Sequence, residues 1–82
     1  MKQQRFPIGL KFMPRNLKYP KEETIVDCLK TYNSKGDLVD LTYVTEHEFM
    51  GQKVRRGCVS DTHIAMSLQS QGRNIEDEII KQ

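Results

Sequence analysis

Apolar and polar residues alternate along two segments in the middle of the chain, 24–32 and 38–45. Both segments are rich in β-branched and aromatic side chains, which favour β-strands. Between them lies a five-residue turn, Asn33 to Asp37, in which Gly36 can adopt a positive φ. The pattern therefore predicts an antiparallel β-hairpin.

The alternation also predicts the register of this hairpin. Pairing Tyr32 with Leu38 and continuing outward groups apolar side chains on one face, whereas a shift by one residue mixes the two faces. The same register places Asp27 on the apolar face, where its carboxylate is expected to accept a hydrogen bond from Tyr43 or to cap a turn. The other predicted pairs are Leu29 with Leu41, Thr31 with Val39, Lys30 with Asp40 and Val26 with Val44.

Shorter elements are predicted on both sides of the hairpin. Residues 6–13 alternate, with three apolar side chains on one face, and the two prolines in 14–23 make that stretch irregular. After the hairpin, residues 51–52 are expected to form a turn. Residues 53–59 are expected to form a strand, with a bulge or bend at Gly57.

Two helices are predicted after the last strand. Ser60 and Asp61 form an N-cap pair for the first helix, and Gly72 supplies its end. Asn74 caps a second helix over residues 75–81, whose acidic residues lie in its first turn. A helix this short is not stable alone in water, so it either packs on the domain or is kept for a partner.

The order of the predicted elements is strand, long loop, hairpin, turn, strand and short helix. This order fits a mainly β protein with short helices: a small, partly open SH3-like β-barrel over residues 1–72, followed by a C-terminal helical tail over residues 73–82. An OB-like barrel is an alternative that usually needs a longer chain. A chain of 82 residues can bury only one thin core, so we expect its function to lie on the surface.

The charge is modest overall but unevenly distributed. The formal net charge is +2, and six basic residues precede the first acidic residue, Glu22, which predicts an electropositive N-terminal surface. The apolar runs are too short for a signal peptide or a membrane span. Cys28 and Cys58 are expected to be free thiols, with a single disulfide as the alternative. We therefore expect a cytoplasmic protein that does not bind a membrane.

No pattern of chemistry-bearing residues points to an enzyme. The two cysteines and two histidines lack the short spacing that is typical of a metal site. Ser60, Asp61 and His63 are near neighbours, but a catalytic triad is assembled by the fold rather than by local sequence. We therefore predict no catalytic residue, no cofactor and no metal, and a small hydrolase is the least favoured alternative.

Basic residues on or beside two predicted strands make nucleic-acid binding the first functional prediction. Such side chains neutralise phosphates, and Tyr19 or Tyr43 could stack on a base. The isoelectric point near 8.6 is low for a dedicated nucleic-acid-binding domain. The predicted binding residues are Lys11, Arg15, Lys18, Tyr19, Lys53, Arg55 and Arg56.

Protein binding is the leading alternative. An open barrel exposes strand edges that can accept another strand, and the apolar stripe formed by Ile75 and Ile79 suits a groove. Self-association as a homodimer is a further alternative, because so small a core gains stability from an interface.

Three stretches of the chain resemble small uncharacterised proteins of bacteriophages and prophages. They are residues 6–15, 24–27 and 42–54, and the likeness spans residues 6–65. The resemblance implies an accessory protein, made in the bacterial cytoplasm, that binds nucleic acid or that binds or inhibits a host protein or defence complex. It brings no site residues with it.

Overall fold

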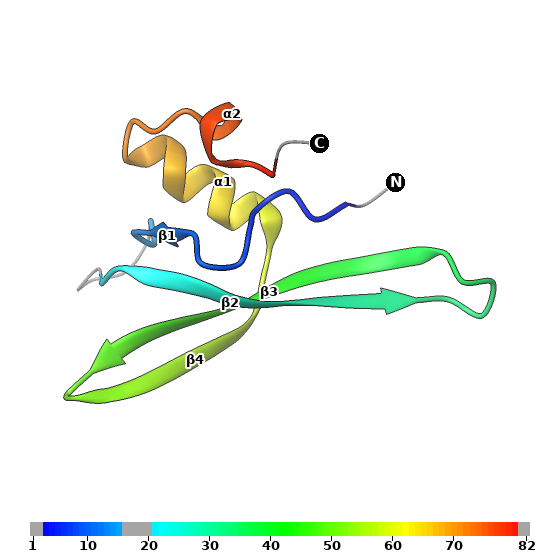
Figure 1. Cartoon of the computed structure of the whole chain (residues 1–82), viewed down its shortest axis with the longest axis horizontal. Helices are drawn as coiled ribbons and strands as arrows, with labels where there is room; N and C mark the ends of the chain where they lie inside the picture. Colours follow the sequence, from blue (N-terminus) through cyan, green and yellow to red (C-terminus); the bar gives the residue numbers. More distant parts are fainter. Residues whose placement is uncertain (1–2, 16–20, 81–82) are drawn as a thin grey trace.

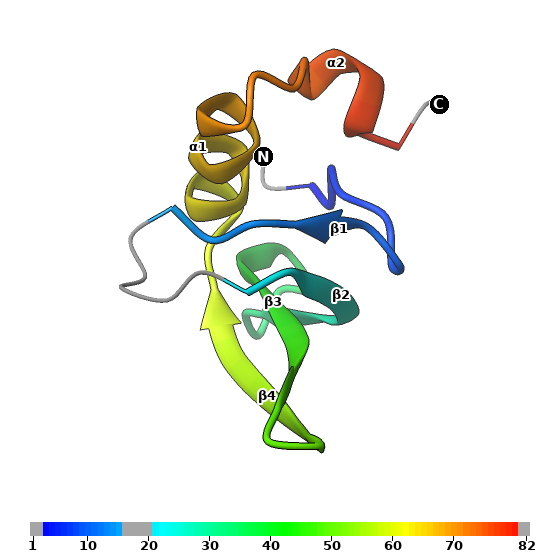
Figure 2. The same cartoon turned by 90° about the vertical axis from the view of Figure 1, so that its left-hand side faces the viewer.

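Four antiparallel strands form one open sheet, and two short helices lie on one side of it (Figures 1 and 2). The structure is a computed structural model that describes residues 3–15 and 21–80. Neighbouring strands in the sheet follow the order β1-β2-β3-β4. The elements are β1 (Lys11–Phe12), β2 (Glu23–Tyr32), β3 (Leu38–Phe49), β4 (Gln52–Val59), α1 (Asp61–Ser70) and α2 (Ile75–Glu78). The prediction of a mainly β chain is confirmed, whereas closure of the sheet into a barrel is not.

The hydrophobic core fills the space between the sheet and the helices. Ile64 and Leu68 of α1 are fully buried and belong to the same cluster as Ile25 of β2 and Tyr43 of β3. The ring of Phe6, from the N-terminal segment, meets the ring of Tyr43 edge-on, with centroids 6.0 Å apart. The core is completed by Phe12, Leu41, Val59 and Ala65.

The central hairpin forms as predicted, but most of its register is different. Tyr32 pairs with Leu38, and Gly36 has the expected positive φ of 86°. Val39 is then an extra residue in β3, and this bulge shifts the pairing along the rest of the ribbon. The predicted pairs beyond Tyr32 are therefore wrong. The observed pairs are Thr31 with Asp40, Lys30 with Leu41, Leu29 with Thr42, Cys28 with Tyr43 and Asp27 with Val44.

The shifted register changes which side chains face the core. Cys28 replaces Asp27 opposite Tyr43, and the carboxylate of Asp27 lies in solvent, where it accepts a hydrogen bond of 2.8 Å from the backbone N–H of Cys28. Leu29 moves to the uncovered face and is 47% exposed. A second bulge at Val26 then returns Ile25 to the core. The physical reason is that a buried, unpaired carboxylate costs more than an exposed leucine.

The predicted first strand is much shorter than its alternating pattern indicates. The backbone N–H of Leu10 donates to the carbonyl of Pro7 at 3.3 Å, and Gly9 has a φ of 97°. This turn breaks the alternation, so Ile8 is exposed while Phe6 is buried. The N-terminal segment therefore crosses the core as a turn, and pairs with β2 only at its end.

Both predicted helices are present and begin at their predicted caps. The hydroxyl of Ser60 accepts a hydrogen bond of 3.0 Å from the backbone N–H of His63, and Gly72 follows α1 with a φ of 74°. The second helix is shorter than predicted because Ile79 is already extended. Ile79 nevertheless packs against the core together with Ile75. The described part of the C-terminal tail is thus docked on the domain.

Both hairpin ends extend away from the helix layer. The molecule measures 43 × 28 × 20 Å, and its long dimension is set by the β2–β3 ribbon, which projects to one side in Figure 1. The β3–β4 turn projects at the opposite end, and in Figure 2 it is the part of the sheet furthest from the helices. Neither described helix is long and apolar enough to cross a membrane.

The observed register predicts unequal effects for two leucines on neighbouring strands. Leu41→Ala removes a side chain that is only 8% exposed and should lower the free energy of unfolding by about 2–3 kcal/mol. Leu29→Ala should lower it by less than about 1 kcal/mol, because this side chain is half in solvent. Urea unfolding of both variants measures the difference. Equal losses would contradict the register.

Candidate functional site

The predicted basic residues are divided between the two faces of the sheet. Lys18 and Tyr19 lie outside the described residues. Arg15 is exposed after β1. Lys11, Lys53 and Arg55 are exposed on the strands, and Arg56 is half-buried and points to the opposite face from Arg55.

On the face away from the helices, the basic side chains are interleaved with acidic ones. Lys11, Thr24, Glu46 and Arg55 form one row across the four strands. The carboxylate of Glu46 lies 3.1 Å from Arg55 Nε and 3.7 Å from Lys53 Nζ. A shallow depression of about 510 Å³ on this face is lined by two lysines and three glutamates. The structure brings the two predicted basic regions together, but on a surface of mixed charge.

Arg56 has a structural partner. Its guanidinium donates at 3.1 Å to the carboxylate of Glu23, a side chain that is only 1% exposed. The other carboxylate oxygen of Glu23 accepts a hydrogen bond of 2.7 Å from the hydroxyl of Thr45, which is also buried. This network keeps a charge buried at the junction of three strands, and it occupies one of the predicted phosphate-binding residues.

Tyr43, the predicted alternative for base stacking, is fully buried and cannot stack on a base. Its hydroxyl accepts hydrogen bonds from the backbone N–H groups of Arg5 at 3.1 Å and Phe6 at 3.3 Å, and donates to Asp61 at 3.4 Å. Burial raises the pKa of the phenol above its ordinary value, because the charged form is desolvated in the core. Tyr43 therefore joins the N-terminal segment, the sheet and α1.

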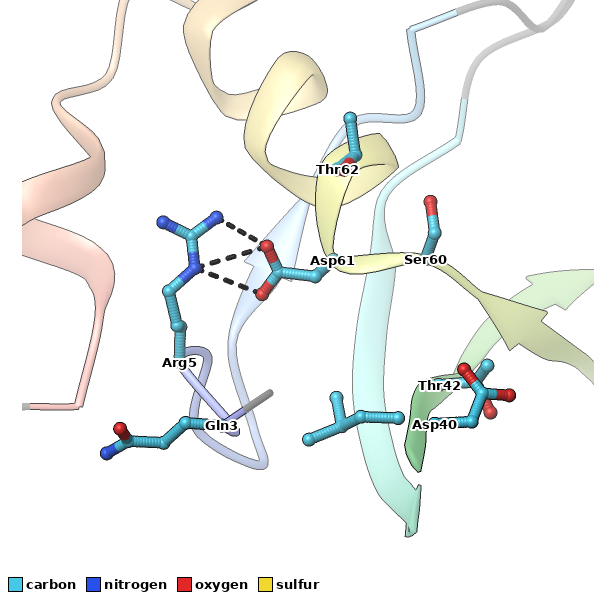
Figure 3. A pocket seen from close by; sticks show the side chains of 8 residues that line it. Gln3, Arg5, Asp40, Thr42, Ser60, Asp61 and Thr62 are labelled. Atoms are coloured by element: carbon cyan, nitrogen blue, oxygen red, sulfur yellow. Dashed lines mark hydrogen bonds and ion pairs between the residues drawn. The ribbon is translucent and has the colours of Figure 1, made fainter. Parts of the chain in front are cut away.

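Beside this hydroxyl lies a pocket of about 490 Å³ at the start of α1 (Figure 3). Its most prominent groups are Arg5 and Asp61, which form a fork-like ion pair with Nε of Arg5 3.1 Å from both carboxylate oxygens. The hydroxyl of Ser60 is occupied in capping the helix. Arg5 and Asp61 thus neutralise each other and hold the N-terminal segment against α1.

The histidines and cysteines do not form a cluster in the described part of the chain. Among the residues described, no three histidine, cysteine or acidic side chains gather as metal ligands, and both cysteines are free. His47 Nδ1 and His63 Nε2 are buried, without a hydrogen-bond partner among these residues. Burial raises the pKa of the Cys28 thiol, which favours its neutral, unreactive form.

The feature that sequence reasoning misplaced is the β3–β4 turn. Phe49 pairs with Gln52, so the turn residues are Met50 and Gly51 rather than Gly51 and Gln52. Both have positive φ, 52° for Met50 and 77° for Gly51, which is the signature of a type I′ turn. The sequence signal for it was the strand pattern on both sides of Met-Gly. A methionine at the first position hides that signal, because asparagine, aspartate or glycine is usual there.

The side chains at this turn form an exposed apolar tip, defined here as Phe49 and Met50. Met50 is 85% exposed and Phe49 is 51% exposed. The ammonium of Lys21 lies 4.9 Å from the centre of the Phe49 ring and donates to the carbonyl of Glu48 at 3.2 Å. This contact holds one face of the phenylalanine in place and leaves the methionine in solvent.

Comparison with known proteins identifies no relative: no protein-family model, curated protein or solved structure matches the chain. Two features of the described surface bear on function here: the apolar tip, and the mixed-charge face beside it.

The two neighbouring arginines of β4 should differ in their effect on stability. Arg56→Ala leaves the buried carboxylate of Glu23 without its cation, and should lower the free energy of unfolding by about 2 kcal/mol, allowing for partial exposure of the arginine. Arg55→Ala removes an exposed pair and should cost about 0.5 kcal/mol. Thermal or urea unfolding measures both. A larger loss for Arg55→Ala would contradict the assignment of the faces.

The Tyr43 hydroxyl should contribute stability that depends on pH. Tyr43→Phe should lower the free energy of unfolding at pH 7 by about 1–3 kcal/mol, because the buried N–H of Phe6 and the partly buried N–H of Arg5 lose their acceptor. The folded-state pKa is raised above 10.0, so the contribution is complete below pH 10 and is lost as the pH rises through the folded pKa. The gap between wild type and variant should therefore narrow in urea titrations above pH 10. A constant gap would show that the phenol is not shielded.

Proposed function

We propose that this chain is a non-enzymatic protein-binding module, and that the apolar tip, Phe49 and Met50, is its anchor in an apolar pocket of the partner protein. The observation that carries the proposal is the backbone of Met50. A large apolar side chain is held 85% exposed at the end of a hairpin, in a conformation that methionine rarely adopts. A protruding apolar side chain of this kind suits a concave pocket.

The backbone conformation of Met50 lowers the stability of the turn, and this supports a role in binding a partner. The left-handed conformation costs a residue other than glycine about 1–2 kcal/mol, whereas asparagine and glycine adopt it readily. Met50 gains nothing in return from packing, because most of its surface is in solvent. Places where a local rule is broken without a compensating contact are expected to be functional sites.

Protein binding is favoured over nucleic-acid binding by the pairing of the basic residues. Arg55 and Lys53 share Glu46, Arg56 is bound to Glu23, and Tyr43 is buried. Nucleic-acid binding depends on cations that are free to neutralise phosphates, and these pairs compete with it. The SH3-like identity and the resemblance to bacteriophage proteins stay predictions. If the resemblance to bacteriophage proteins holds, the partner is a protein of the bacterial host.

Replacing Met50 should separate stability from binding. Met50→Asn should raise the free energy of unfolding by about 1 kcal/mol, because asparagine tolerates the positive φ, and should abolish capture of the partner by immobilised protein from bacterial lysate. Cys58→Asn is the matched control. Cys58 also has a positive φ, 57°, and is exposed, but it lies in the β4 bulge away from the tip. This control should gain similar stability and keep the captured protein.

Two results would contradict the proposal. Capture of the same proteins by wild type and Met50→Asn would show that the tip is not the anchor. The nucleic-acid alternative would be favoured instead if the protein binds nucleic acid with an affinity that falls steeply as salt rises. This binding should then be lost in a variant with Lys53 and Arg55 replaced by serine.

A further inference from the structure

The outer edge of β2 is open along most of its length. β1 pairs with β2 only at Glu23 and Thr24, and two further backbone hydrogen bonds join residues 9–10 to Ile25. From Val26 to Tyr32, no described strand lies on this side of β2. The far part of the ribbon projects beyond α1 and α2 in Figure 1, whereas Cys28 still packs against the core. The edge of β2 in the projecting part is therefore open to another strand.

The open segment has few of the features that protect edge strands. It contains no proline or glycine, and three of its seven residues are β-branched or aromatic. Its two charges are one acid and one base, Asp27 and Lys30, so its net charge is zero. Leu29 and Tyr32 are 47% and 57% exposed. Such a segment is a template for main-chain pairing with another strand.

The charges of the segment favour a second copy of itself as the added strand. In an antiparallel pair of strands, directly opposed side chains lie on the same side of the sheet. When the two strands are related by a two-fold axis, one residue must therefore oppose its own copy, and the axis passes midway between the two. An axis at Lys30 places two like charges in contact. An axis at Leu29 instead places Leu29 against its own copy, Asp27 opposite the hydroxyl of Thr31, and Lys30 opposite Cys28. No charge then faces its own kind.

We propose that two copies of this chain associate through antiparallel pairing of their β2 edges, with the two-fold axis at Leu29. The two sheets then form one continuous sheet, and both helix layers lie on the same side of it. The outer edge of β3 is a poorer candidate, because only the stretch from Leu38 to Thr42 is left uncovered by β4. This proposal does not depend on the apolar tip, which lies at the other end of β3.

Sedimentation equilibrium of the full chain tests the association. The wild-type protein should show a monomer–dimer equilibrium. Leu29→Lys places two ammonium groups at the axis and should weaken dimerisation by about tenfold or more. Val39→Lys is the control, because Val39 has nearly the same exposure, 46%, but lies on β3. A wild-type chain that stays monomeric at high concentration, or equal weakening by both variants, would overturn the proposal.

Disulfide trapping tests the register. In a background with Cys28 and Cys58 replaced by serine, Leu29→Cys places two thiols across the axis, where the Cα separation of facing residues suits a disulfide. Oxidation should then yield a covalent dimer, and Thr31→Cys in the same background should not. Trapping through Cys28 in the native chain, without trapping at position 29, would overturn this register. Correct folding of each variant is checked by circular dichroism.

Discussion

The buried hydroxyl of Tyr43 is the contact on which the arrangement of this domain depends. It accepts two backbone N–H groups from the N-terminal segment and donates to the first residue of α1, so three parts of the chain meet at one atom. Asp61 completes the junction through its ion pair with Arg5. Because these groups are satisfied within the domain, the core can be small and still have a defined geometry.

This concentration of contacts leaves two hairpin ends outside the core. The helices, the N-terminal segment and the central part of the sheet bury one another, while the β2–β3 ribbon and the β3–β4 turn project into solvent. A two-stranded ribbon is only marginally stable by itself, so both ends depend on the core for their order. Exposed apolar side chains gather at these ends, which is why both proposals concern them.

The sequence predicted the hairpin, the two helix caps and the strand that carries Gly57, because each has a local chemical signal. It did not predict the positions at which one extra residue in a strand changes which side chains face the core. The bulges at Val39 and Val26 have no signature in alternation, and they exchanged Asp27 for Cys28 on the core face. The site was only partly predictable. Lys53 and Arg55 lie on one face of the sheet, but their neutralisation by Glu46 needs the cross-strand register. Met50 was missed because its turn type is unusual for methionine.

The two hairpin ends depend on the core for their order but are not part of it. Hydrogen exchange of dilute protein can distinguish the two regions. Amides of Tyr43 and Thr45 should exchange only through global unfolding, while those between Thr31 and Asp40 should exchange through local opening that costs at least about 2 kcal/mol less. Equal protection of the ribbon and the core in dilute protein would show instead that the ribbon opens only when the core unfolds.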